Sequence, residues 1–82
     1  MHEENIIETT RRIISELLAI SPAAIEITTD LFDLGFDSLT ALQLVARIRS
    51  ELEVELSIRD LYTSPCIEGI VAAINRRQTA LR

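Results

Sequence analysis

The stretch Asp33-Leu34-Gly35-Phe36-Asp37-Ser38-Leu39-Thr40-Ala41 decides the fold, because it ends a long loop and begins a helix. Asp37 has the side chain of a helix N-cap, so we expect a helix that starts at Ser38 and runs to about Leu52. One arc of roughly 100° on this helix collects the residues that should face the core. These residues are Ala41, Leu44, Val45, Ile48 and Leu52.

The same helix is apolar over too wide an angle for a single buried stripe. Leu39 and Ala46 fall well outside the core-facing arc, and Leu42 lies at its margin. Apolar residues that have no partner inside a protein are available to another protein. We therefore expect a partner interface on the exposed side of the helix, formed by Leu39, Leu42, Gln43, Ala46 and Arg49.

An amphipathic helix is predicted before this stretch, from about Glu4 to Ile20. Its apolar residues have helical spacing on one face: Ile6, Ile7, Ile13, Ile14, Leu17 and Leu18. Ser21-Pro22 then ends the helix. The connection over residues 21–37 is unusually long for a small domain, and such loops are often functional. Its apolar residues predict that it is pinned onto the core.

Two further helices are predicted after residue 52. Residues 51–58 alternate between apolar and polar types, which is a strand signal, but a lone strand here has no convincing mate. We interpret the segment as an extended connector and keep a small α+β fold as the alternative. Ser57 should cap one short helix, and Ser64-Pro65 should start the last helix, with the serine as N-cap.

These elements predict one all-α domain over residues 1–82. It is a small bundle of three main helices and one short helix, with a long first loop. The ordered core should span about residues 4–76, and residues 77–82 should form a frayed tail. A chain of 82 residues is too small for both a packed core and an enclosed substrate pocket. We expect a monomer.

The charge and the composition disfavour several classes of function. The net charge is −5, and all eight Lys or Arg residues are arginines that do not form one basic face. Binding to nucleic-acid phosphates needs concentrated positive charge, so this composition disfavours nucleic-acid binding. No apolar run is long enough for a membrane span, and the acidic N-terminus lacks the features of a signal peptide. The single cysteine, Cys66, has no partner for an internal disulfide, so we expect a reducing, cytoplasmic location.

The sequence offers no set of catalytic or metal-binding residues. The sole histidine, His2, lies at the terminus, so neither a serine nor a cysteine nucleophile has a base. Cys66 is expected to be a partly buried structural residue. Asp30, Asp33 and Asp37 suggest a calcium loop, but its twelfth position is Ala41 instead of Glu. We expect no catalytic residue and no metal, and interpret these aspartates as capping and solvated residues.

Ser38 has its hydroxyl in the first turn of a helix, where backbone N–H groups and the helix dipole favour a phosphate on that oxygen. On residue types alone, an ordinary serine at a helix start explains it better. Residues 33–41, however, resemble the phosphopantetheine attachment motif of acyl carrier proteins, with Asp-Ser-Leu at its centre. The resemblance continues to Ile48, includes residues 61–65, and covers residues 6–74 in all.

The resemblance implies a four-helix carrier bundle in which Ser38 accepts 4′-phosphopantetheine from coenzyme A. A separate Mg²⁺-dependent phosphopantetheinyl transferase performs that step, so the domain is a substrate and not an enzyme. The terminal thiol of the attached group then holds acyl groups as thioesters. In this motif the attachment position is surrounded by Gly35, Phe36, Asp37 and Leu39.

Residues 35–41 are closest to the acyl carriers of polyketide synthases, and the chain resembles a discrete carrier. Gln43, Arg47 and Arg49 stand where fatty-acid carriers usually have acidic residues. The expected partners are the transferase and an acyltransferase, a ketosynthase or another synthase or tailoring enzyme. Two alternatives stay open. One is an aminoacyl or peptidyl carrier of a nonribosomal pathway, loaded by an adenylation enzyme, and the other is a helical protein-interaction module without a prosthetic group.

Overall fold

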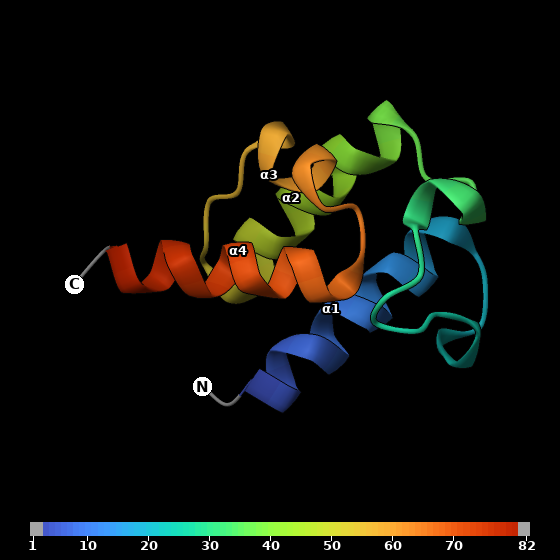
Figure 1. Ribbon diagram of the computed structural model, residues 1–82, viewed down its shortest axis with the longest axis horizontal. Helices are drawn as coiled ribbons and strands as arrows, with labels where there is room; N and C mark the ends of the chain where they lie inside the picture. Colours follow the sequence, from blue (N-terminus) through green and yellow to red (C-terminus); the bar gives the residue numbers. More distant parts are fainter. Residues whose placement is uncertain (1–2, 81–82) are drawn as a thin grey trace.

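The structure, a computed structural model, describes residues 3–80, and these form helices and loops without a strand (Figure 1). The predicted all-α class is confirmed, and the α+β alternative is wrong for this part of the chain. His2 and residues 81–82 lie outside the described residues. With η for a 3₁₀-helix, the elements are α1 (Glu3–Leu18), η1 (Pro22–Ala24), η2 (Leu31–Leu34), α2 (Ser38–Leu52), α3 (Ile58–Thr63) and α4 (Ile67–Ala80).

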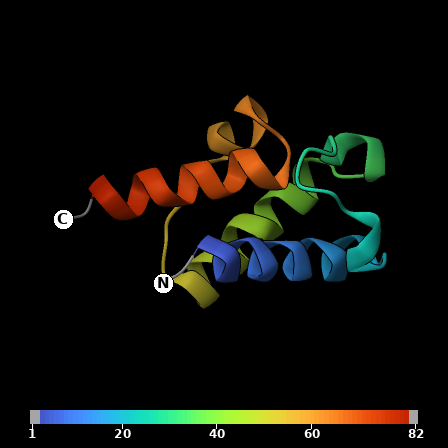
Figure 2. The ribbon, with the colours of Figure 1, turned by 60° about the horizontal axis from the view of Figure 1, so that its bottom comes forward.

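The first helix is central to the packing, because α1 contacts both α2 and α4 (Figure 1). α1 and α4 run side by side in opposite directions, and the short α3 lies against α2 and α4 (Figure 2). On α2 the predicted core face is confirmed except at Val45, which is only partly buried.

No helix within residues 3–80 is long and apolar enough to cross a bilayer. The core consists of Ile6, Ile13, Ile14, Ile25, Leu31, Phe36, Ala41, Leu44, Ile48, Leu52, Val54, Leu56, Leu61, Ile67, Ile70, Val71, Ala73 and Ile74.

The long connection between α1 and α2 is pinned onto the core, as its apolar residues predict. The backbone N–H of Leu31 donates to the carbonyl oxygen of Pro65 over 2.8 Å, and that of Glu68 donates to the carbonyl oxygen of Ile27 over 2.9 Å. Both bonds tie the connection to the beginning of α4. The side chains that the connection buries are Ile25, Leu31 and Phe36.

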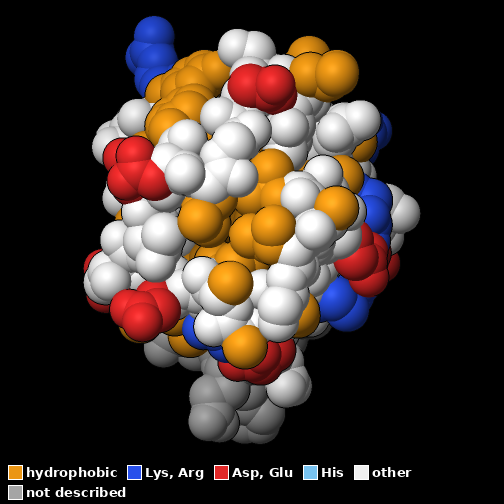
Figure 3. Space-filling view, turned by 90° about the vertical axis from the view of Figure 1, so that its right-hand side faces the viewer, with side chains coloured by type: hydrophobic (Ala, Val, Ile, Leu, Met, Phe, Trp, Pro, Cys, Tyr) orange, Lys and Arg blue, Asp and Glu red, His pale blue; other side chains and the backbone are white. Residues whose placement is uncertain are grey.

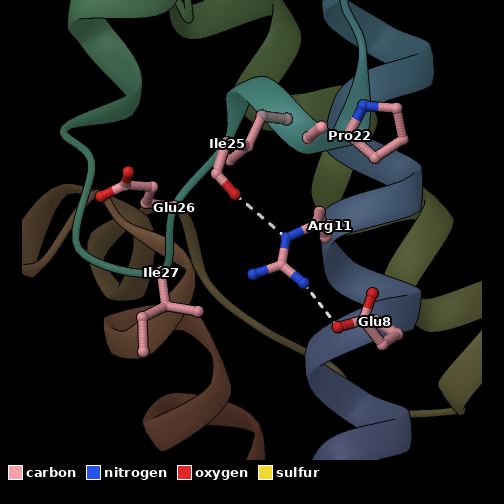
Figure 4. A pocket seen from close by; sticks show the side chains of 7 residues that line it. Glu8, Arg11, Pro22, Ile25, Glu26 and Ile27 are labelled. Atoms are coloured by element: carbon pink, nitrogen blue, oxygen red, sulfur yellow. Dashed lines mark hydrogen bonds and ion pairs between the residues drawn. The ribbon is translucent and has the colours of Figure 1, made fainter.

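Arg11 ties the same connection to α1 (Figure 4). Its Nε donates a hydrogen bond to the carbonyl oxygen of Ile25 over 3.0 Å, and its guanidinium pairs with Glu8. Arg11 lines an open groove together with Pro22, and none of residues 33–41 lines it. Because the charge of Arg11 is already paired, we interpret the groove as a structural junction.

Residues 53–57 form a connector without helix or strand, which confirms our interpretation of the alternating pattern for these residues only, because residues 51–52 end α2 and Ile58 begins α3. Glu53 itself is left-handed, with a φ of 57°, and caps the end of α2. Val54 and Leu56 are buried, whereas Glu53 and Glu55 are exposed. An extended chain that lies along a core buries every second side chain, with or without a partner strand. The alternation therefore indicates burial here and not strand pairing.

The beginning of α4 differs from the prediction, because Ser64 does not cap it. The helix starts at Ile67, and Cys66 takes the capping place. The carbonyl oxygen of Cys66 accepts a bond from the N–H of Ile70 over 3.0 Å, and its Sγ accepts one from the N–H of Gly69 over 3.4 Å. Ser64 instead closes α3, and the bond from the long connection to Pro65 keeps that residue outside the helix.

The end of α4 also differs from the prediction. The helix continues to Ala80, beyond residue 76, where we expected the ordered core to end. Neither glycine nor proline occurs in residues 70–80 to interrupt it. Nη2 of Arg77 also lies 2.8 Å from the Asp60 carboxylate in α3, which anchors the last turns of α4. The rest of the expected tail, residues 81–82, lies outside the described residues.

Candidate functional site

Ser38 is the first residue of α2, and its side chain is exposed. The carboxylate of Asp37 accepts hydrogen bonds from the backbone N–H and from the hydroxyl of Thr40, both over 2.9 Å. Asp37 is thus the N-cap of α2, as predicted. Both bonds stabilise the ionised form of Asp37 and so lower its pKa below the ordinary value, the bond from the backbone of Thr40 more than the bond from its hydroxyl. A negative charge is therefore held directly before Ser38.

Gly35 turns the chain from η2 towards α2. Its φ of 100° lies in the left-handed region, which residues with a side chain rarely adopt. Its N–H donates to the carbonyl oxygen of Phe32 over 3.2 Å. Phe36 follows and is only 3% exposed. The bend therefore anchors Phe36 in the core and leaves the next two residues at the surface.

Sequence reasoning missed two aromatic residues near Ser38: Tyr62, which contacts it, and Phe32, which is stacked on Tyr62. The hydroxyl of Tyr62 is 2.8 Å from Ser38 Oγ, and this hydrogen bond joins α3 to α2 across 24 positions of the chain. The ring of Phe32 is stacked on that of Tyr62, with centroids 5.5 Å apart and planes 4° from parallel. Phe36 meets Phe32 edge to face at 5.6 Å. The site therefore includes residues of η2 and α3 as well as the start of α2.

Both added aromatic residues are considerably exposed, Phe32 to 39% and Tyr62 to 42%. Each follows a buried leucine, Leu31 or Leu61, and Tyr62 also lies in the stretch 61–65 to which the sequence resemblance extends. Figure 3 views the molecule from the side of the long connection and shows hydrophobic side chains gathered at that surface. The junction before α2 is thus bordered by apolar surface.

The exposed face of α2 carries all the residues predicted to contact a partner. Leu39 is 64% exposed and Leu42 is 57% exposed, so Leu42 lies clearly outside the core-facing arc. The guanidinium of Arg49 is 3.6 Å from the carboxylate of Glu55, and both side chains are mostly in solvent. Gln43 and Ala46 are also exposed. The structure brings these residues to one face, and their contact with a partner stays a prediction.

The other candidate residues have structural roles. Asp30 caps η2 by accepting a hydrogen bond from the N–H of Phe32 over 2.9 Å, which confirms its interpretation as a capping residue. Cys66 is partly buried and caps α4. Within residues 3–80, no three histidine, cysteine or acidic side chains are grouped so that they could hold a metal ion.

The similarities to known proteins extend over most of the chain. A protein-family model described as "Phosphopantetheine attachment site" matches residues 8–74. The chain is 35% identical over 72 residues to the nonribosomal peptide synthetase kk1B of Curvularia clavata. It is 30% identical over 73 residues to the non-reducing polyketide synthase mapC' of Penicillium brevicompactum. These alignments cover 88% and 89% of this chain but only 1% and 3% of the two relatives.

A solved structure shares the fold, with a TM-score of 0.81 and 25% sequence identity. The match covers 88% of this chain and 91% of the other chain. That structure contains the phosphopantetheine transferase Sfp in complex with coenzyme A and a peptidyl carrier protein. The likeness therefore extends over nearly the whole bundle.

Proposed function

This chain belongs to the phosphopantetheine attachment-site family, and from that premise we propose that Ser38 is the residue that carries 4′-phosphopantetheine. The chain is a carrier domain, and 4′-phosphopantetheine is its prosthetic group. One observation carries the proposal: Ser38 has an exposed hydroxyl on the first residue of a 15-residue helix, inside the matched stretch. Backbone N–H groups and the dipole at such a helix start stabilise an attached phosphate.

The surroundings of Ser38 fit an attached phosphodiester. Ser38 and the nearby Gly35 are exposed, so no buried side chain has to move to make room. The carboxylate of Asp37 is engaged by Thr40, which limits its repulsion of a phosphate. The hydroxyl of Tyr62 is a further polar group in contact with Ser38 Oγ. Ser38 would therefore hold the group, with the hydroxyl of Tyr62 beside it.

The reaction on this chain is a substitution at phosphorus. The Oγ of Ser38 forms a bond with the pantetheine-linked phosphorus of coenzyme A, the pyrophosphate bond breaks, and adenosine 3′,5′-bisphosphate leaves. The proton of the Ser38 hydroxyl passes to a base that we assign to a separate phosphopantetheinyl transferase. When bound, the prosthetic group supplies a thiol that holds acyl groups as thioesters. The protein itself provides a tether, which raises the effective concentration of the acyl group at a partner's active site.

The acyl groups that we propose are those of polyketide-type biosynthesis. The support is the resemblance of residues 35–41 to polyketide carriers, together with the similarity to the synthase mapC'. The second candidate is an aminoacyl or peptidyl carrier, which the similarity to kk1B and to the peptidyl carrier structure favours. Membership in the family speaks against a helical module without a prosthetic group. Loading by an acyltransferase but not by adenylation enzymes is expected, and the reverse result would favour the peptide pathway.

We propose that the exposed face of α2 meets the transferase first and then the synthase enzymes, in the cytoplasm. Leu39 and Leu42 support this role, because they are the large apolar residues that α2 leaves in solvent. One carrier must visit several enzymes in turn, so each contact should be small and transient. The residues that we assign to it are Leu39, Leu42, Gln43, Ala46 and Arg49.

Intact mass measurement tests the attachment site. The chain is incubated with coenzyme A and a broad-specificity phosphopantetheinyl transferase. We expect the wild type to gain the mass of one phosphopantetheine and Ser38→Ala to gain nothing. Ser50→Ala is the matched control, because Ser50 is exposed on the same helix and should leave the modification intact. No adduct on the wild type, or an adduct that survives Ser38→Ala, would contradict the proposal.

A further inference from the structure

We propose that Tyr62 belongs to the attachment site and that its hydroxyl donates a hydrogen bond to the phosphate on Ser38. The inference rests on the function proposed above, because it requires a phosphate at that residue. It adds a side chain of α3 to a site that the sequence motif confines to residues 33–41. The contact between the hydroxyls of Ser38 and Tyr62 is the observation from which it starts.

The distance between the two hydroxyls puts the phosphate within reach of Tyr62. The hydroxyl oxygens of Ser38 and Tyr62 are 2.8 Å apart. The phosphorus would be bonded directly to Ser38 Oγ. The other phosphate oxygens would then lie one bond from the phosphorus and two bonds from Oγ. Rotation about the bonds of the short serine side chain is then enough to turn one of these oxygens towards the phenol. A side chain that already contacts Oγ needs little movement to contact the phosphate.

Modification also changes which of the two groups can donate. Before modification, either hydroxyl is able to donate to the other. Afterwards Ser38 Oγ is an ester oxygen without a proton, so only Tyr62 donates. The phosphate oxygens carry negative charge, and a hydrogen bond to a charged acceptor is roughly twice as strong as one between neutral groups. The phenol should therefore exchange its neutral partner for the phosphate.

Tyr62 is held in place for this contact from two sides. Its ring is stacked on Phe32, with the planes nearly parallel. A helix of six residues is not stable alone, but α3 has a capping box in which Ser57 and Asp60 exchange hydrogen bonds of 3.0 and 3.2 Å. The carboxylate of Asp60 also pairs with Arg77 of α4 at 2.8 Å. The tyrosine hydroxyl is thus positioned by α4 and η2 before any phosphate is attached.

The test compares the wild type with Tyr62→Phe, each with and without the prosthetic group. Phenylalanine keeps the stacked ring and removes only the hydroxyl. Intact mass first establishes that both proteins are fully modified, and the thermal midpoint of unfolding is then measured for all four forms. For each protein we take the midpoint of the modified form minus that of the unmodified form. This difference should be higher in the wild type than in Tyr62→Phe by roughly 4–8 °C, since only in the wild type does a charged hydrogen bond replace a neutral one.

Two spectroscopic measurements report on the contact itself. In phosphorus NMR, the resonance of the phosphodiester should differ between modified wild type and modified Tyr62→Phe. The chain has one tyrosine and no tryptophan, so its intrinsic emission comes from Tyr62 alone and should change when the wild type is modified. Thr63→Val is the matched control, because it removes a hydroxyl of α3 that bonds to the carbonyl oxygen of Arg59. We expect it to behave as the wild type.

The outcomes separate this inference from the proposed function. Equal midpoint changes and equal phosphorus resonances in fully modified wild type and Tyr62→Phe would overturn the role of Tyr62 and leave the attachment at Ser38 intact. If Thr63→Val reproduced the effect of Tyr62→Phe, the assignment to the tyrosine hydroxyl would be wrong. A wild type that accepts no prosthetic group would refute the proposed function, and the inference would fail with it.

Discussion

At the scale of single residues, the two sides of α2 should respond to truncation in opposite ways. Leu44 is 0% exposed, whereas Leu39 is 64% exposed. Leu44→Ala removes packed atoms and leaves a cavity, so it should lower the free energy of unfolding by roughly 2–5 kcal/mol. Leu39→Ala should change it by no more than about 0.5 kcal/mol. Urea unfolding followed by circular dichroism measures both values.

The same two variants separate stability from partner binding. Leu39→Ala should slow modification by the transferase, because it trims the exposed face of α2. Leu44→Ala should be modified at the rate of the wild type, provided that the assay is run well below its unfolding midpoint. A Leu39→Ala protein that is as unstable as Leu44→Ala would show that we assigned the faces of α2 wrongly.

Residue-level prediction works within one helix and fails between helices. Leu39 and Leu44 were assigned correctly from helical spacing, and Asp37 was recognised as the cap from its residue type and position. The contact of Tyr62 with Ser38 was missed. It depends on how α3 packs against α2 and α4, which no local pattern of residues specifies.

At the scale of elements, the junction of α3 and α4 leaves no room for a side chain at Gly69. A Cβ there would lie 2.2 Å from Ser64 Oγ and 2.5 Å from the carbonyl oxygen of Ser64. Replacing a helical glycine by alanine ordinarily stabilises a protein by roughly 0.5–1 kcal/mol. Here the overlap reverses the sign, and Gly69→Ala should lower the free energy of unfolding by roughly 1–3 kcal/mol, as overpacking does.

The reverse substitution on the same helix is the control for this junction. Ala72 is exposed on α4, so Ala72→Gly should show the ordinary helix preference and destabilise by roughly 0.5–1 kcal/mol. Alanine would then be favoured at position 72 and glycine at position 69. Urea unfolding of both variants tests this contrast, and a stabilising Gly69→Ala would show that the junction is looser than the structure indicates.

The elements themselves were largely predictable, since amphipathic spacing and capping residues are local signals. The bounds of α2 and the cap of α3 at Ser57 were correct. The start of α4 was not, because two backbone bonds, from the N–H of Leu31 to Pro65 and from the N–H of Glu68 to Ile27, override the local preference of Ser64-Pro65 for a helix start. The sequence predicted that this connection is pinned but did not indicate its two 3₁₀-helices.

At the scale of the whole molecule, four alternating charges join α1 to α2 across the surface. Nη2 of Arg47 lies 2.6 Å from Glu16 and 3.0 Å from Glu51, and Arg12 also pairs with both carboxylates. The bond from Arg47 lowers the pKa of Glu16, and the bonds from Arg12 and then Arg47 lower that of Glu51. Each exposed ion pair contributes little to stability by itself. Because the pKa values of the two glutamates are lowered, we expect the four charges together to make the stability of the fold depend on pH.

The free energy of unfolding of the whole molecule should fall when the pH drops into the range in which its carboxylates become protonated. A carboxyl whose pKa is lower in the folded than in the unfolded chain stabilises the fold above its unfolded pKa, and this contribution is lost as the pH falls through the folded value. Hydrogen bonds lower the pKa of Asp37, Asp60 and Glu51 in this way. The thermal midpoint should therefore drop below about pH 4. Glu51→Gln should flatten that drop, whereas Glu55→Gln, in a solvent-exposed pair, should leave it unchanged. An equally steep drop in Glu51→Gln would show that the charges joining α1 to α2 do not contribute to it.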